Sequence, residues 1–294
     1  MFDKNTKISK NELIVLGGLF LLVILFSFIR LPDGRLHIYF LNVGQGDAMF
    51  IQTPNGSQIL IDGGPDDKVL SELGRVMPFY DRSIDMIVST HLDADHVAGL
   101  IEVLKRYSVD EIVESGMDCT TVYCKEWDRL KDAESAKDIF VHLSDYIVTE
   151  DGVEIAVLNP FRDINGQDFS KRNNEGVVLK LKYKNQSVLF TADIEASVEH
   201  KLVLSGVDID SDFLKVGHHG SRTSTTEEFL RKVSPVVAFI EVGAHNSYGH
   251  PTKDVLDRLE SFSIPYYRTD IDGRIELILD GNNYKINKTQ KLGE

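Results

Sequence analysis

The sequence has few cysteines and no excess of basic charge, and each shortage excludes a class of protein. Two of the 294 residues are cysteine, which leaves no second Cys-x-x-Cys pair for a structural zinc site. The formal net charge is −14, so the chain as a whole does not hold nucleic acid through bulk electrostatics. Low-complexity runs, short-period repeats and inter-domain linkers are also absent. The roughly 260 residues after the first thirty therefore make one large domain or two small ones.

Only one long uncharged apolar run is present, LIVLGGLFLLVILFSFI at residues 13–29. As a helix it would span about 25 Å, and Lys4, Lys7 and Lys10 before it favour an N-terminus inside the cell. A cleaved signal peptide is an alternative, although no small-residue cleavage site follows, and a buried core helix is another. We expect a single-pass membrane protein with four parts: a cytoplasmic N-terminus (1–12), a transmembrane signal anchor (13–30), a linker (31–35) and an extracytoplasmic domain (36–294).

The two cysteines, Cys119 and Cys124, are separated by four residues in the segment DCTTVYC. Outside the membrane this gap can be closed by a disulfide, which is what we expect if the domain is extracytoplasmic. Two free thiols in a loop are the alternative.

Hydrophobic periodicity divides the rest of the chain into two successive β-rich blocks, each ending in strand–helix units. We expect strands near 36–43, 48–54, 57–64, 84–90, 109–115, 153–158, 177–183, 187–192, 212–216, 236–242, 265–267 and 274–279. We expect helices near 68–77, from about 96, around 127–138, and near 195–204, 226–233 and 252–261. This order predicts two sheets packed together with helices outside.

The segment THLDADHVAG follows an expected buried strand and contains four candidate ligands, His91, Asp93, Asp95 and His96. In an extended loop alternate residues point the same way, so the first three can converge on one point. His96, at the start of the helix, can reach an adjacent point. This arrangement suits two metal ions, whereas the alternative is a polar loop in which Asp95 caps the helix.

Two further strands also end in candidate ligands. Asp193 closes LFTAD, and His218 and His219 follow an apolar strand in LKVGHHGSRTS. Each could be an ordinary turn residue if it stood alone. Three such strand ends in one chain favour a metal centre.

Six segments together resemble a known family: FLNVGQGDAMFIQTPNGSQILIDGG, STHLDADHVAGL, LFTADI, FLKVGHHGSRTS, NSYGHPT and YRTDIDG. They are similar to the metallo-β-lactamase-fold hydrolases and, more narrowly, to the hydrolase domain of ComEC-type competence proteins. The resemblance runs from about residue 36 to residue 280. The multi-spanning region of ComEC proteins has no counterpart here, so a role in DNA uptake would need a separate channel protein.

The resemblance implies an α+β fold, a four-layer αβ/βα sandwich, preceded here by the one transmembrane helix. By motif, His91, Asp93 and Asp193 would bind one ion. Asp95, His96, His218 and the shared Asp193 would bind a second. Many relatives have one more histidine before the bridging aspartate, and the matching segment here, KRNNEGVVLKL, has none.

Further roles follow from the same resemblance, and each has an ordinary structural alternative. We expect Asp95, His219 and His250 to be catalytic, with either histidine orienting the scissile phosphate or protonating the leaving oxygen. Asp47 and Asp62 are expected to brace the loops around the ions. The expected substrate contacts are Asn173, Asn174, Ser221 and His250.

Asp93 stands where a third histidine is expected in the first loop, and this replaces a nitrogen ligand by oxygen. Oxygen-rich sites favour Mn²⁺ or Mg²⁺, although Zn²⁺ also accepts carboxylates. Two divalent ions suit a phosphodiester substrate and would supply the positive charge that the acidic chain lacks. We therefore expect a metal-dependent nuclease acting on DNA. The alternatives are hydrolysis of a cell-surface phosphodiester or a β-lactam, or a non-catalytic binding module; the oligomeric state is open.

Overall fold

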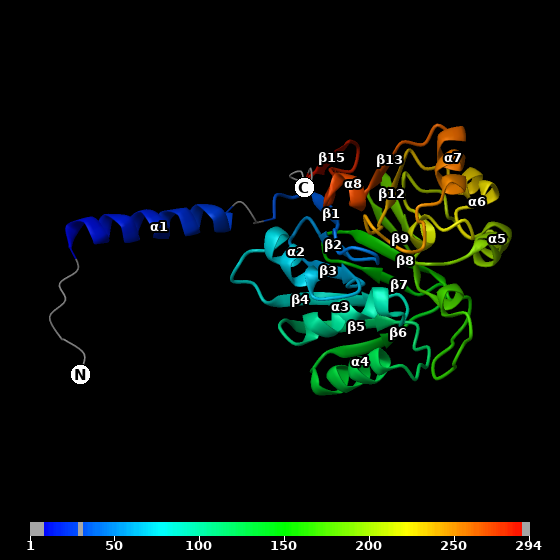
Figure 1. The fold of residues 1–294 in the computed structure, drawn as a ribbon, viewed down its shortest axis with the longest axis horizontal. Coiled ribbons are helices and arrows are strands. Elements are labelled where there is room, and N and C mark those ends of the chain that lie inside the picture. Colours follow the sequence, from blue (N-terminus) through cyan, green and yellow to red (C-terminus); the bar gives the residue numbers. More distant parts are fainter. Residues whose placement is uncertain (1–8, 29–31, 290–294) are drawn as a thin grey trace.

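A computed structural model describes residues 9–28 and 32–289, as one extended helix and a two-sheet body (Figure 1). The helices are α1 Lys10–Phe28, α2 Lys68–Val76, α3 Ala94–Leu104, α4 Val122–Ala133, α5 Ala196–Ser205, α6 Glu227–Val233, α7 Lys253–Ser261 and α8 Thr269–Asp272, with short 3-10 helices η1 Arg172–Glu175 and η2 Gly217–Gly220. The first sheet is built from β1 Leu36–Phe40, β2 Met49–Gln52, β3 Gln58–Ile61, β4 Ser83–Ser89, β5 Ser108–Glu114, β6 Lys137–Phe140, β14 Ile275–Leu279 and β15 Tyr284–Lys288. The second is built from β7 Tyr146–Val148, β8 Val153–Asn159, β9 Val178–Tyr183, β10 Gln186–Phe190, β11 Phe213–Lys215, β12 Val237–Ile240 and β13 Tyr266–Arg268.

The two sheets share one plan, an antiparallel part followed by a parallel part. The first has the strand order β15-β14-β1-β2-β3-β4-β5-β6 and is parallel from β3 to β6. The second has the order β13-β12-β11-β10-β9-β8-β7 and is parallel from β10 to β13. The β15–β14 hairpin adds the last strands of the chain to the first sheet, beside β1.

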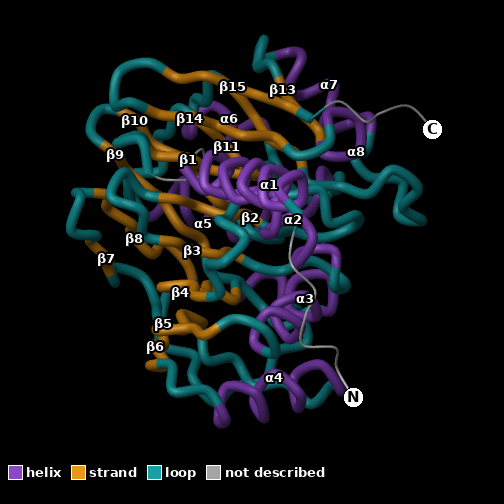
Figure 2. The backbone as a smooth tube through the Cα atoms, turned by 90° about the vertical axis from the view of Figure 1, so that its left-hand side faces the viewer, coloured by secondary structure: helices purple, strands orange, loops and turns teal. Residues whose placement is uncertain are grey.

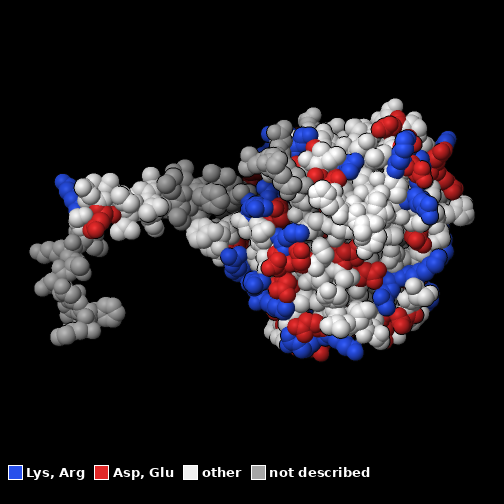
Figure 3. Space-filling model, in the orientation of Figure 1, with Lys and Arg blue, Asp and Glu red and all other residues white. Residues whose placement is uncertain are grey.

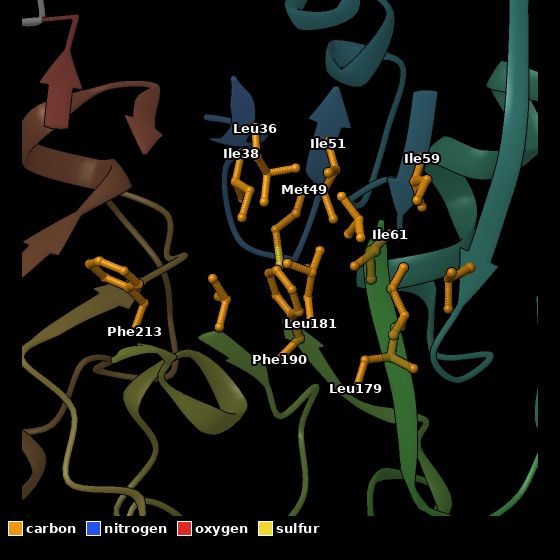
Figure 4. Close-up of a cluster of buried hydrophobic side chains, with 14 of the residues drawn as sticks. Leu36, Ile38, Met49, Ile51, Ile59, Ile61, Leu179, Leu181, Phe190 and Phe213 are labelled. Atoms are coloured by element: carbon orange, nitrogen blue, oxygen red, sulfur yellow. The ribbon is translucent and has the colours of Figure 1, made fainter. Parts of the chain in front are cut away.

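Apolar side chains from both sheets fill the space between them. Figure 4 shows Ile51, Leu181 and Phe190 among these side chains, which point toward one another from the two sheets. The rings of Phe40 and Phe239 stack across this interface with their centres 4.2 Å apart. Burial of this apolar surface is the main force that holds the sheets together.

Helices cover the outer face of each sheet and complete a four-layer sandwich. A second apolar cluster joins the first sheet to α2, α3 and α4, and a third joins the second sheet to α5, α6 and α7. Figure 2 shows α2, α3 and α4 on one side of strands β3 to β6. The expected sandwich of two sheets with outer helices is therefore confirmed.

Helix α1 extends away from the sandwich in Figure 1, and its large apolar side chains between residues 13 and 21 are more than half exposed. In the part of the chain that the structure describes, no helix is both long and apolar enough to cross a lipid bilayer. The side chains of residues 22–31, which would complete the expected anchor at 13–30, lie outside the described residues, as do residues 1–8.

Three strands, the short helix α8 and one helix boundary differ from the sequence-based expectation. Strands β6, β7 and β15 were not expected, and their residues are mostly exposed or half-buried. Strands of this kind at the ends of sheets lack the apolar pattern on which a sequence prediction depends. Helix α4 spans Val122–Ala133, earlier than the expected 127–138.

Candidate metal centre

The candidate ligands lie at one edge of the sandwich, where three strands end. Strand β4 leads into His91, β10 into Asp193 and β11 into His219. Because β10 and β11 are parallel neighbours, their carboxyl ends meet at the same edge of the second sheet. The loop after β4 reaches this edge from the first sheet, so ligands from both sheets converge.

Two facing glycines hold α3 close to the loop after β3. A side chain on Gly99 would place its Cβ 1.8 Å from the carbonyl oxygen of Gly63, so no larger residue fits. The amide of Gly63 donates to the carbonyl of His96 at 2.8 Å, and the amide of Gly99 donates to that of Gly64 at 2.9 Å. This packing fixes the first turn of α3, which carries Asp95 and His96, against the loop that contains Asp62.

Four side chains, Asp95, His96, Asp193 and His219, form what we call the buried cluster. Each offers one ligand atom, and all four atoms lie within 4.8 Å of one another. Nε2 of His219 is 3.4 Å from Asp95 Oδ2 and 3.3 Å from Asp193 Oδ2. Nε2 of His96 is 3.4 Å from the same Asp193 oxygen. Two nitrogens and two carboxylates at this spacing can hold one divalent ion.

The polar atoms of the cluster fit a metal ion better than they fit one another. Among the described residues, Nε2 of His96, Nε2 of His219 and Oδ1 of Asp193 are buried without a hydrogen-bond partner. Nε2 of His91, just outside the cluster, is in the same condition. Buried polar atoms are normally satisfied, and a group of unsatisfied ones requires an explanation. A cation bound among these nitrogen and oxygen atoms would satisfy them.

In the absence of a metal ion, the interactions between the cluster's histidines and carboxylates determine their pKa values. Burial alone would lower the pKa of His96 and His219, but Asp193 together with Asp62 at His96, and together with Asp47 at His219, outweighs burial and raises each pKa well above its usual value. Burial alone would raise the pKa of Asp193, yet the two imidazoles hold it well below its usual value. The pocket is therefore built to hold positive charge, which a divalent ion supplies in a more concentrated form.

The Nδ1 atoms of the two cluster histidines have partners, which leaves their Nε2 atoms facing inward. Nδ1 of His96 lies 2.8 Å from Asp62 Oδ2, and the amide and hydroxyl of Thr90 donate to Asp62 at 2.8 and 2.6 Å. Nδ1 of His219 lies 3.0 Å from the carbonyl oxygen of Glu241 and 3.1 Å from Asp47 Oδ1. Such partners orient metal-binding histidines, so Asp62 and Asp47 lie where the sequence analysis placed supporting carboxylates.

Lys215 is a part of the site that the candidate residues of the sequence analysis do not include. Its side chain is completely buried, forms an ion pair with Asp47, donates to the carbonyl of Ala192 at 3.1 Å and lies 3.7 Å from Asp193 Oδ1. Burial opposes its charge, but Asp47 and Asp193 outweigh burial and raise its pKa to about 12. The position of this lysine in the apolar strand FLKVG was the available sign that it is buried and paired.

The remaining candidates form a looser group, which we call the open set: His91, Asp93 and His218. Nε2 of His91 is 3.9 Å from Asp93 Oδ2, and Nε2 of His218 is 3.8 Å from Asp193 Oδ2. The side chain of Asp93 is 36% exposed and that of His218 is 25% exposed. Arg172 lies 3.4 Å from Asp93. The ligand atoms of this group lie farther apart than those of the buried cluster, at 3.8–3.9 Å, although His91 is itself buried.

The structure reverses the expected places of the paired histidines. The sequence analysis gave His218 to the second ion and kept His219 for catalysis, whereas the geometry places His219 in the buried cluster and His218 beside the open set. Both residues have left-handed backbone conformations, with φ of 50° and 52°. This turn directs the two rings apart, at 67° to each other, so that only the second ring reaches Asp95.

A small pocket of about 170 Å³ opens over the two groups of ligands. Its lining is Gln45, Asp93, Asp95, Asn173, Asp193, His218, His219, Tyr248 and His250. Asn173 and His250 therefore lie where a substrate could reach them, and Gln45 and Tyr248 are additions that the sequence did not suggest. Burial lowers the pKa of His250, and the nearby His218 lowers it further by charge repulsion. A cleft lined by ligands and polar side chains has the form of a reaction site.

Two other expected substrate contacts do not line this pocket. Asn174 accepts a hydrogen bond from the amide of Glu195 at 3.0 Å and lies 3.3 Å from its carboxylate. The hydroxyl of Ser221 lies 3.0 Å from that of Thr223. Both side chains therefore stabilise loops around the site in this structure.

The two cysteines are joined by a disulfide, with Cα atoms of Cys119 and Cys124 5.8 Å apart. The bond closes the N-terminus of α4, where Thr121 caps the helix through the amide of Cys124. The next turn of α4 buries Trp127, whose indole donates to Glu114 at 3.0 Å. The disulfide thus fixes the start of a helix that packs against α3.

Comparison with known proteins decides the family. Residues 41–245 match the Metallo-beta-lactamase superfamily. The chain belongs to this superfamily. The match includes the loop of His91, Asp193 and the His218–His219 pair, and it confirms the resemblance that the sequence segments suggested.

The relatives of this superfamily member include competence proteins. The chain is 29% identical to ComE operon protein 3 of Bacillus subtilis, covering 92% of this chain and 36% of the relative. It is 28% identical to competence protein ComA of Neisseria gonorrhoeae, covering 86% and 34%. The chain thus spans about a third of the length of these relatives. CmlA, a diiron β-hydroxylase from Streptomyces venezuelae, shares the fold at 14% identity, with a TM-score of 0.55 and coverage of 84% and 55%.

Proposed function

We propose that this domain is a metal-dependent phosphodiesterase that cleaves DNA with two divalent ions. The observation that carries the proposal is the convergence of unsatisfied buried ligand atoms from Asp193, His96 and His219 beside a second, open group of ligands. The similarity to competence proteins favours DNA as the substrate.

The buried cluster would hold the tighter ion, and the open set would hold the second ion with Asp193 shared between them. Mn²⁺ or Zn²⁺ fits the mixed nitrogen and oxygen donors, and the carboxylates also allow Mg²⁺. Nε2 of His218 is 3.8 Å from the Asp193 oxygen that the cluster histidines also face. We propose that His218 supplies the ion of the open set with the ligand that the absent middle histidine provides in many relatives.

The ions would supply two things to this reaction: an activated water and a positive charge for the phosphate oxygens. The residues of the chain position the substrate around them. Asn173 and His250 line the pocket and can contact the phosphate or the leaving group. The lowered pKa of His250 keeps its imidazole neutral near pH 7, so it would accept a proton or hydrogen bond rather than add charge.

A local cation site also explains how an acidic chain could bind the negatively charged phosphates of DNA. Figure 3 shows basic and acidic side chains interleaved over the face that is drawn, without a broad basic surface. A duplex-binding protein usually displays such a surface. Here the ions would provide the positive charge at the point where the phosphate must bind.

Cleavage of DNA by the full-length protein in mild detergent tests the proposal. We expect labelled single-stranded or duplex DNA to be cut with Mn²⁺, Mg²⁺ or Zn²⁺ and to remain intact with a chelator. Asp193→Ala should abolish cleavage, whereas Asp110→Ala, which alters an exposed aspartate on β5, should not. If the wild-type protein binds metal but leaves DNA intact with all three ions, the substrate is a different one.

We also propose that the run at residues 13–29 anchors the domain to a membrane with the catalytic part outside the cytoplasm. The uncharged sequence, the upstream lysines and the exposed apolar surface of α1 support this. Protease added to intact cells should then digest the C-terminal domain. Protection of that domain would overturn the proposed orientation.

A further inference from the structure

Tyr248 stands out at the mouth of the metal pocket because its aromatic ring is exposed. Its side chain is 68% exposed, the highest value among the aromatic residues described in the range 32–289. The same residue lines the pocket together with His250 and the candidate metal ligands. An aromatic ring that faces solvent beside a reaction site is a candidate contact for a substrate.

The loop that presents Tyr248 is held in place by a single asparagine. The side-chain amide of Asn246 donates to the carbonyl oxygens of Gly243 at 2.9 Å and His250 at 2.7 Å. Its Oδ1 atom accepts from the amides of Tyr248 at 3.2 Å and His250 at 3.0 Å. The backbone around the ring is therefore fixed before a substrate arrives, which reduces the entropy lost on binding.

Stacked rings connect Tyr248 to the metal ligands. The ring of Tyr248 lies 5.8 Å from that of His250, at 26° to it, and His250 in turn contacts His218 edge to face at 5.7 Å. These contacts set the orientation of the tyrosine relative to the pocket. Tyr248 lines the same pocket as the candidate ligands, so a nucleobase next to a phosphodiester held in that pocket could contact the ring.

We infer that Tyr248 is a stacking platform for a nucleobase next to the scissile phosphate and that the enzyme prefers single-stranded DNA. The inference rests on the proposed nuclease function. A base in a duplex is covered on both faces by its neighbours, whereas a base in a single strand is free to stack on an aromatic side chain. Stacking is also independent of net charge, which suits a chain with a net charge of −14.

The first test compares three full-length variants on oligothymidylate: Tyr248→Ala, Tyr248→Trp and the control Tyr146→Ala, which removes a half-exposed ring on the edge strand β7. We expect Tyr248→Ala to raise KM about 5- to 100-fold, the usual effect of losing one stacked base, and to bind metal as before. Tyr248→Trp should retain a low KM, and the control should match the wild type. A KM for Tyr248→Ala within about twofold of the wild type would overturn the inference.

A second test separates stacking from a merely structural role of the tyrosine. For the wild type, KM should be higher for an oligonucleotide with an abasic site beside the cleaved bond than for the intact oligonucleotide. For Tyr248→Ala, KM should be the same for both oligonucleotides. Equal effects of the abasic site on both proteins would overturn the inference, as would better cleavage of duplex than of single-stranded DNA by the wild type.

The same experiments distinguish failure of the inference from failure of the proposed function. If the wild type cleaves no DNA at all, the nuclease proposal fails. Binding of a fluorescent phosphorothioate oligothymidylate, measured by anisotropy, then tests the platform alone: weaker binding by Tyr248→Ala supports it, and equal binding overturns it.

Discussion

Two groups of histidines and carboxylates in this protein have a similar composition, but they differ in whether both nitrogens of each histidine have hydrogen-bond partners. Near the start of β1, Nδ1 of His37 lies 2.9 Å from Glu276 and Nε2 lies 3.0 Å from Asp33, so both ring nitrogens have partners. In the buried cluster, Nδ1 of each histidine has a hydrogen-bond partner, whereas Nε2 of His96 and of His219 has no hydrogen-bond partner among the described residues and only faces carboxylate oxygens at 3.3–3.4 Å.

The difference shows why one group is structural and the other is a candidate metal centre. A histidine held between two carboxylates forms a complete ion pair when it is protonated, so it needs no ligand. Each cluster histidine has one nitrogen without a hydrogen-bond partner, and this nitrogen is available to bind a metal ion. The candidate metal centre is identified by inward-facing atoms that lack hydrogen-bond partners, and not by the number of histidines.

The largest effect should come from Asp193→Ala, which removes the residue shared by both proposed ions. We expect close to two ions per chain in the wild type and close to none in the variant, measured by metal analysis after dialysis. Fewer than about one ion per wild-type chain would contradict the dinuclear proposal. Glu276→Ala, which breaks the His37 group, should leave the metal content unchanged.

The next effect distinguishes the two adjacent histidines. His219→Ala should weaken the tighter ion strongly, because His219 completes the buried cluster, whereas His218→Ala should affect mainly the weaker ion. Calorimetric titration of the metal-free protein with Mn²⁺ or Zn²⁺ measures both. Loss of the tighter ion in His218→Ala alone would favour the order expected from the sequence.

This pair also shows where reasoning from the sequence stops. The sequence predicted that Asp193 and the late histidines would join the first loop in one metal centre, because all three groups of candidate ligands follow apolar strands. The sequence could not decide which histidine faces inward, since that depends on two left-handed residues in one turn. The sequence could not place Lys215 in the site for a similar reason: its partner Asp47 is 168 positions away in the chain, and only the fold brings them together.

A smaller effect should follow from Asp62→Asn, which keeps the size of the side chain but removes its charge. Asp62 orients His96 through Nδ1 and receives two hydrogen bonds from Thr90. Loss of such a partner typically weakens metal binding by about 10- to 100-fold. The same titration measures it, and an unchanged affinity would mean that the helix packing at Gly99 alone positions His96.

The smallest effect concerns the complete group at His37, and its dependence on pH can be stated in advance. Burial opposes protonation of His37, but the hydrogen bonds that its ring nitrogens donate to Glu276 and Asp33 outweigh burial and raise the pKa of the imidazole, while the pKa of Glu276 falls to about 2. A raised histidine pKa contributes stability that is complete below the unfolded value of about 6.5 and is lost as pH rises through the folded value. Glu276 contributes stability above its unfolded pKa of about 4.5 that is lost as pH falls toward 2. His37→Gln should therefore lower Tm by about 2–4 °C near pH 5.5 and by less at pH 9, as followed by circular dichroism; an equal loss at both pH values would show that packing rather than charge is responsible.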